Sequence, residues 1–81
     1  MISFTVEHRP EEANPADLSW CVLKHGRPHI WFRHEVYAEG FAIVSNRGAN
    51  MISAQKFVKA MPDDLKEAEA YIHKLKDQDD D

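Results

Sequence analysis

Residues 18–34 read LSWCVLKHGRPHIWFRH, and two runs of alternating side chains in this stretch flank His25-Gly26-Arg27-Pro28. Gly26 can adopt a positive φ without steric cost, and Pro28 has no N–H to donate to a strand ladder. A tight turn or a bulged loop is therefore expected at this point, with one strand on each side. The stretch predicts a β-hairpin.

The alternation also assigns the hairpin side chains to two faces. Ile30 and Phe32 share one face, and His29, Trp31 and Arg33 share the other. Burial of the second set would place two ionisable groups in the core, which is unfavourable unless they are paired. We therefore expect Ile30 and Phe32 in the core and Trp31 on an open face. The alternative is that Trp31 covers the edge of a small core.

The segments around the hairpin predict two further strands. Residues 1–8 alternate between apolar and polar side chains, which is the period of a half-buried strand. Residues 9–18, RPEEANPADL, contain two prolines and no periodicity, and they predict a solvated loop. The apolar run 41–44 follows Gly40 and ends at the turn-rich Ser45-Asn46-Arg47-Gly48, which predicts a short fourth strand.

A helical period replaces the alternation after Gly48. The first predicted helix begins at an N-cap, Ser53, and its apolar residues follow the spacing i, i+3, i+4 and i+7: Ala54, Phe57, Val58 and Met61. Pro62 ends this helix and serves as the first residue of a second one, residues 63–77. Carboxylates in the first turn and lysines in the last turn suit the dipole of the second helix. Its apolar stripe consists of Leu65, Ala68, Ile72 and Leu75.

The predicted fold class is α+β, a small antiparallel three- to four-stranded meander with two C-terminal helices packed on one face. Residues 1–78 are expected to form one domain, with Trp20 in its core, and residues 79–81 to form an acidic disordered tail. The single cysteine excludes an internal disulfide. A partner, or a homodimer formed through the open sheet face, is then the remaining source of stability.

The hairpin reverses the charge of the chain locally. The sequence has 14 Asp and Glu against 10 Lys and Arg, a net charge of -4, yet residues 18–34 contain no carboxylate. Cations beside aromatic rings are typical of binding surfaces. The predicted partner-binding residues are Lys24, His25, Arg27, His29, Trp31 and Arg33.

Metal binding is a weaker hypothesis for the same stretch, which contains four possible ligands: Cys21, His25, His29 and His34. Zinc binds such donors in a tetrahedron, but C-x3-H-x3-H-x4-H matches no standard finger or knuckle. We therefore rank a small metal-binding protein below a protein-binding and a nucleic-acid-binding one. We predict no metal and no cofactor.

Catalysis has no recognisable constellation in the sequence. Cys21 with a histidine is the only nucleophile arrangement, and it lacks the local signature of a cysteine hydrolase. A small buried apolar side chain is the plainer interpretation of Cys21. The three glycines are expected at separate turns and form no phosphate-binding loop. We predict that the chain is not an enzyme.

A small protein-binding module is the function that remains. We expect an adaptor or inhibitor that occludes a site on a larger protein with an acidic or mixed surface, a form common among phage and mobile-element accessory proteins. A nucleic-acid-binding accessory protein that uses the same hairpin is the alternative, although a pI of 5.7 gives no whole-molecule attraction to phosphate. The N-terminus has no signal-peptide pattern, and the composition is too polar for a membrane span. We therefore expect a cytoplasmic protein without a membrane partner.

Overall fold

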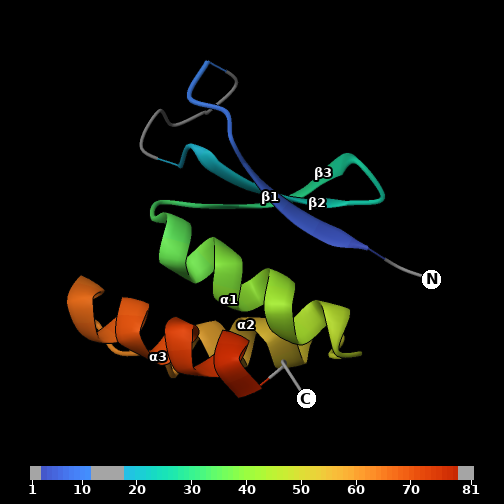
Figure 1. Cartoon of the computed structure of the whole chain (residues 1–81). Helices are drawn as coiled ribbons and strands as arrows, with labels where there is room; N and C mark the ends of the chain where they lie inside the picture. The colour runs from blue at the N-terminus through green and yellow to red at the C-terminus, as the bar shows by residue number, and fades with distance from the viewer. Residues whose placement is uncertain (1–2, 12–17, 79–81) are drawn as a thin grey trace.

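The computed structural model of the chain describes residues 3–11 and 18–78. In chain order the elements are β1 (Phe4–His8), β2 (Trp20–Lys24), β3 (Arg27–Phe32), α1 (Glu35–Asn46), α2 (Met51–Lys59) and α3 (Leu65–Gln78) (Figure 1). The predicted α+β class is confirmed. The predicted acidic tail, residues 79–81, and most of the predicted loop 9–18 lie outside the described residues.

The strands form an antiparallel meander in the order β1-β2-β3. Val6 lies opposite Val22, and Val22 lies opposite Ile30. The connection between β2 and β3 is a two-residue turn, with φ angles of 55° at His25 and 79° at Gly26. Positive φ at both central residues is the type I′ geometry, whose twist matches that of the flanking strands. The predicted hairpin is confirmed.

A β-bulge in β3 changes the faces that the sequence predicts. The register shifts after Val22, so that His29 is an extra residue in β3. The centroid of the His29 ring lies 5.8 Å from that of Phe4 and 6.0 Å from that of Phe41. His29 therefore turns toward α1. The prediction that it shares a face with Trp31 is wrong, because strict alternation has no place for an inserted residue.

Residues 41–44 are helical, and the predicted fourth strand is wrong. They belong to α1, and a short apolar run does not distinguish a buried strand from a buried helix. Gly40, which we expected at a turn, lies inside this helix. A Cβ at this position would lie 2.8 Å from Met61 Sδ and 3.2 Å from Ile72 Cδ1. Glycine therefore lets α1 approach its neighbours closely.

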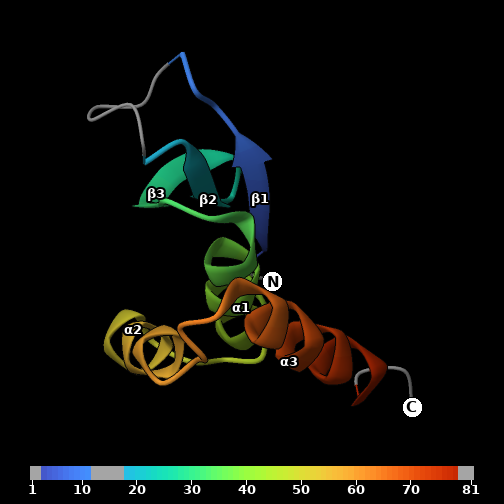
Figure 2. The same cartoon turned by 90° about the vertical axis from the view of Figure 1, so that its left-hand side faces the viewer.

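The molecule has three layers, and α1 is the middle one (Figure 1, Figure 2). On one side α1 packs against all three strands. On its other side it contacts α2 and α3, and neither of these two helices packs against a described strand. The prediction that two C-terminal helices cover the sheet is therefore wrong, because α1 covers it. Val22 and Phe41 are central to the apolar cluster between the sheet and α1, against which three predicted core residues pack: Trp20, Ile30 and Phe32.

Side-chain caps define the starts of the two C-terminal helices. Asn50 Oδ1 accepts the N–H of Ser53 at 2.8 Å, so that Asn50, not Ser53, is the N-cap of α2. Asp64 Oδ1 accepts the N–H groups of Lys66 and Glu67 at the start of α3. Such a cap contributes about 1 kcal/mol. Both predicted helices are present, with starts that differ by a few residues from the prediction.

Candidate interaction surface

The structure distributes the six predicted binding residues over three places. Trp31 lies on the sheet face turned away from α1, opposite Cys21. Arg33 follows β3 and lines a groove with Tyr37 of α1. The other four gather at the hairpin turn: Lys24, His25, Arg27 and His29.

The hairpin turn presents its cationic side chains from a fixed backbone. The N–H of His25 donates to the C=O of Ser3 at 3.0 Å, which ties the turn to the segment that leads into β1. Lys24, His25 and Arg27 are exposed, and His29 is half-buried. These four residues and the neighbouring proline line a hollow of about 480 Å³, to which the described part of the chain contributes no carboxylate. Two permanent positive charges therefore face solvent here without an ion-pair partner among the described residues.

The connection between α1 and α2 lies beside this turn. Both Lys24 and His29 also line a second hollow, of about 490 Å³, which we call the junction hollow; its other lining residues are Phe4, Phe41, Ser45, Asn46, Gly48, Ala49, Asn50 and Met51. Asn46 fixes the arrangement, because its side chain accepts the N–H of Phe4 at 2.8 Å and donates to the C=O of Phe4 at 2.9 Å. The two hollows together form what we call the turn surface.

The turn surface joins two carboxylate-free parts of the sequence. The hairpin belongs to residues 18–34, and the helix connection belongs to residues 40–62, which also contain no Asp or Glu. The second stretch is visible in the sequence as a gap between Glu39 and Asp63. Nothing in the sequence indicates that it meets the hairpin, so its residues were missing from the predicted site. Folding brings the two stretches together at one end of the molecule.

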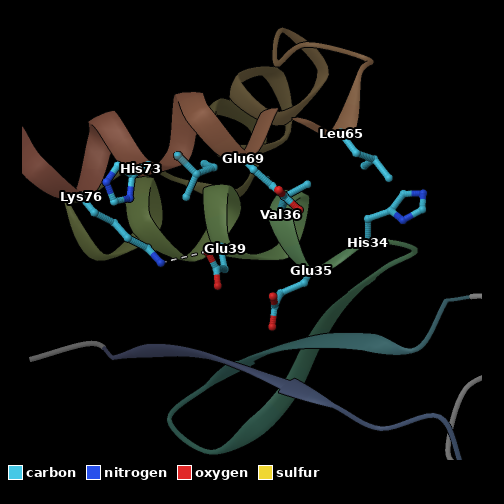
Figure 3. A pocket seen from close by; sticks show the side chains of 9 residues that line it. His34, Glu35, Val36, Glu39, Leu65, Glu69, His73 and Lys76 are labelled. Carbon is cyan, nitrogen blue, oxygen red and sulfur yellow. Dashed lines mark ion pairs between the residues drawn. The ribbon is translucent and has the colours of Figure 1, made fainter. Parts of the chain in front are cut away.

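Carboxylates gather in a different hollow, the α1–α3 cleft, which has a volume of about 250 Å³. Figure 3 shows acidic and basic side chains side by side in this cleft. Lys76 Nζ lies 3.0 Å from Glu39 Oε2. The remaining ionisable lining residues are Glu35, Glu69, His34 and His73. Charges of both signs are therefore mixed in the cleft, where three carboxylates and one lysine meet and Glu39 is paired with that lysine.

The edge of β1 is closed to a partner strand at Phe4, and the edge of β3 is interrupted at Pro28 and His29. The C=O of Ser3 accepts the N–H of His25 in the hairpin turn. Backbone groups along an edge strand point alternately toward the neighbouring strand and away from it, so the N–H and C=O of Phe4 point outward from β1. Both of these outward groups are occupied by Asn46. On β3, Pro28 lacks an N–H and His29 forms the bulge, and both features protect sheet edges.

Trp31 is half-buried, and His29 does not join it in the predicted cluster, because the His29 ring lies beside Phe4 and Phe41. Two further apolar residues of the same sheet face, Cys21 and Leu23, have exposed fractions of 0% and 1%. These central side chains are therefore not available to a partner. The centre of this face is therefore buried, and Trp31 is its partly exposed aromatic residue.

The possible metal ligands do not converge. Among the described residues, no three His, Cys, Asp or Glu side chains lie close enough to hold a metal ion. Cys21 is buried, and its thiol donates to the C=O of Val22 at 3.6 Å. His25 lies at the exposed turn.

Comparison of the chain with protein-family models, with curated proteins and with solved structures gives no match. Within residues 3–11 and 18–78, no helix is long and apolar enough to cross a membrane. Function is therefore inferred from the chemistry of the turn surface.

Proposed function

We propose that this chain is a protein-binding module that recognises an acidic surface on a larger protein and occludes it. The observation that carries the proposal is the turn surface, where Lys24 and Arg27 are exposed and where, within residues 3–11 and 18–78, no carboxylate lines either hollow. Charge complementarity steers encounter and disfavours partners of like charge. The partner is therefore expected to present Asp or Glu side chains.

The backbone of the turn surface suits recognition without rearrangement. The type I′ turn holds the hairpin cations, and the two bonds from Asn46 to Phe4 hold the helix connection against β1. A preorganised surface avoids the entropic cost of ordering loops on binding.

A protein partner suits this surface better than a nucleic acid. Apolar groups of Phe4, Ala49 and Met51 line the junction hollow beside Lys24. Burial of this apolar surface against an apolar side chain of a partner is favourable. A phosphate backbone has no such side chain. The net charge of -4 also opposes non-specific attraction to nucleic acid.

Site-specific photo-crosslinking in cells of the source organism tests the proposal. The crosslinking residue replaces Pro28 at the turn or, as a control, Lys74 on the exposed side of α3. We expect protein adducts at position 28 that survive nuclease treatment, and no adducts at position 74. Adducts to nucleic acid at position 28 would contradict the proposal and favour the alternative partner.

Charge reversal provides a matched pair of variants for the same assay. Lys24→Glu with Arg27→Glu changes the net charge as much as Lys66→Glu with Lys74→Glu on α3. We expect the first pair to reduce the adduct yield at position 28 at least about tenfold, because two rim charges become repulsive. The second pair should leave the yield unchanged. Equal losses in both would mean that net charge, and not the turn surface, governs binding.

A further inference from the structure

We infer that the junction hollow takes one apolar side chain of the partner, held between that partner's carboxylates. The inference rests on the proposed function and adds the chemistry of the recognised segment. That segment is a short stretch of protein in which Asp or Glu flanks an apolar residue.

The junction hollow has the size and lining of a side-chain site. Its volume of about 490 Å³ lies within the roughly 300–1,000 Å³ that is typical of ligand pockets. Its accessible apolar lining includes the half-buried side chains of Phe4 and Ala49, and Phe41 is fully buried behind them in the core. The bulge adds the imidazole of His29, which lies beside both rings. An apolar side chain that enters this hollow would exchange water for ring and methyl contacts.

Exposed apolar residues stand beside the hollow. Met51 lines it and is 41% exposed, and the next residue in the first turn of α2, Ile52, is 66% exposed. Large apolar side chains that are exposed beside a cavity are typical of an interaction site, because a partner that covers them removes apolar surface from water. A partner segment seated in the hollow would cover Met51 directly.

The charges around the hollow determine which residues of the partner are favoured on either side of that apolar side chain. Lys24 lines the hollow, and no carboxylate of the described residues does. The first turn of α2 also lacks acidic residues, and the side chain that caps it, Asn50, is uncharged. Both features favour carboxylates immediately beside the inserted side chain.

Entry of the partner as a paired β-strand is prevented at this place. Asn46 occupies both outward backbone groups of Phe4, which a partner strand would need. Recognition at the junction hollow must therefore use a side chain and not a strand ladder.

Titration of the ¹⁵N-labelled full chain with synthetic peptides, followed by NMR, tests this inference. The probes are Asp-Asp-Leu-Asp-Asp, Asp-Asp-Ser-Asp-Asp and Lys-Lys-Leu-Lys-Lys. We expect the acidic leucine peptide to shift the amide resonances of Phe4, Ala49 and Met51. It should bind at least about fivefold more tightly than the acidic serine peptide, because part of the leucine is buried. The basic peptide should cause no shift at these residues.

Met51 and Leu65 form a matched pair of variants, because both are 41% exposed and only Met51 lines the junction hollow. Met51→Ser should reduce the affinity for the acidic leucine peptide to that for the serine peptide, and Leu65→Ser should not change it. Lys24→Ala should weaken the binding of both acidic peptides. Lys74→Ala should weaken neither.

The outcomes separate this inference from the proposed function. Equal binding of both acidic peptides at the turn surface would overturn the inference and leave the proposed function intact. Shifts confined to the α1–α3 cleft, absence of binding by both acidic peptides at millimolar concentration, or equal binding of the basic peptide would overturn both.

Discussion

The turn surface and the α1–α3 cleft are both hollows between elements that are distant in sequence, but the turn surface is cationic and the cleft has charges of both signs. Lys24 and Arg27 lie at the turn surface, whose lining contains no carboxylate from the part of the chain that the structure describes. In the cleft, Glu39 and Lys76 pair at 3.0 Å. Charges that are already offset within the protein gain little from a partner, whereas exposed charges of one sign select a partner of the other. The difference favours recognition at the turn surface and helix packing at the cleft.

Both regions depend on α1, which contributes one end to each of them. Its last residue, Asn46, holds the turn surface together through Phe4. Its first two turns supply Glu35, Val36 and Glu39 to the cleft. Changes along this one helix therefore separate the two regions experimentally.

The largest expected loss of stability comes from a substitution on the side of α1 that faces α3. Gly40→Val places a Cβ 2.8 Å from Met61 Sδ and 3.2 Å from Ile72 Cδ1, and it adds two methyl groups to a packed core. We expect the free energy of unfolding to fall by about 3 kcal/mol, measured by urea denaturation with circular dichroism.

Gly48→Ala is the control for this change. Its Cβ would meet no atom within 4 Å, and only the backbone, at φ 106°, would be strained. We expect a loss of about 1 kcal/mol. A smaller loss in Gly40→Val than in Gly48→Ala would contradict the close packing of α1.

A smaller loss of stability is expected from a substitution at the turn surface. Asn46→Ala removes two hydrogen bonds to Phe4 and leaves its backbone groups open at the edge of β1. We expect a loss of about 1 kcal/mol in unfolding free energy, together with concentration-dependent association in light scattering. Asn50→Ala removes one cap bond at a similar cost and leaves the backbone groups of Phe4 covered. Equal association of both variants would refute the edge-protecting role of Asn46.

The smallest effect is expected in the cleft. Glu39→Gln removes the ion pair with Lys76, and because both side chains are partly exposed, solvent screens the pair. We expect a change below about 0.5 kcal/mol in a double-mutant cycle with Lys76→Gln, measured by urea denaturation. Binding of the acidic leucine peptide should stay the same. A loss of peptide binding in Glu39→Gln would show that the two regions are not independent.

The hairpin and α3 could be predicted because their signals are local. His25-Gly26 between two alternating runs is a short-range turn signal, and the period of α3 is supported by Asp64 at its start. The middle helix could not be predicted in this way. Gly40 resembles a turn residue in sequence, but its absent side chain serves a contact with Met61 and Ile72.

The candidate site was predictable in part for the same reason. Lys24, His25 and Arg27 are neighbours in the sequence, and the turn keeps them together. His29 changed faces at the bulge, and Trp31 and Arg33 lie elsewhere, because strand register and helix placement set their surroundings. These features depend on pairing between strands and not on the period of one strand.

Residue order alone is enough to establish a charge-reversed hairpin, an amphipathic C-terminal helix and a single buried cysteine side chain. The composite turn surface follows from packing. Its central contact joins Phe4 and Asn46, which are 42 positions apart. That contact forms because α1 buries apolar surface against the sheet on one side and against α2 and α3 on the other. Burial between layers is a property of the assembled fold, and no local period along the chain reports it.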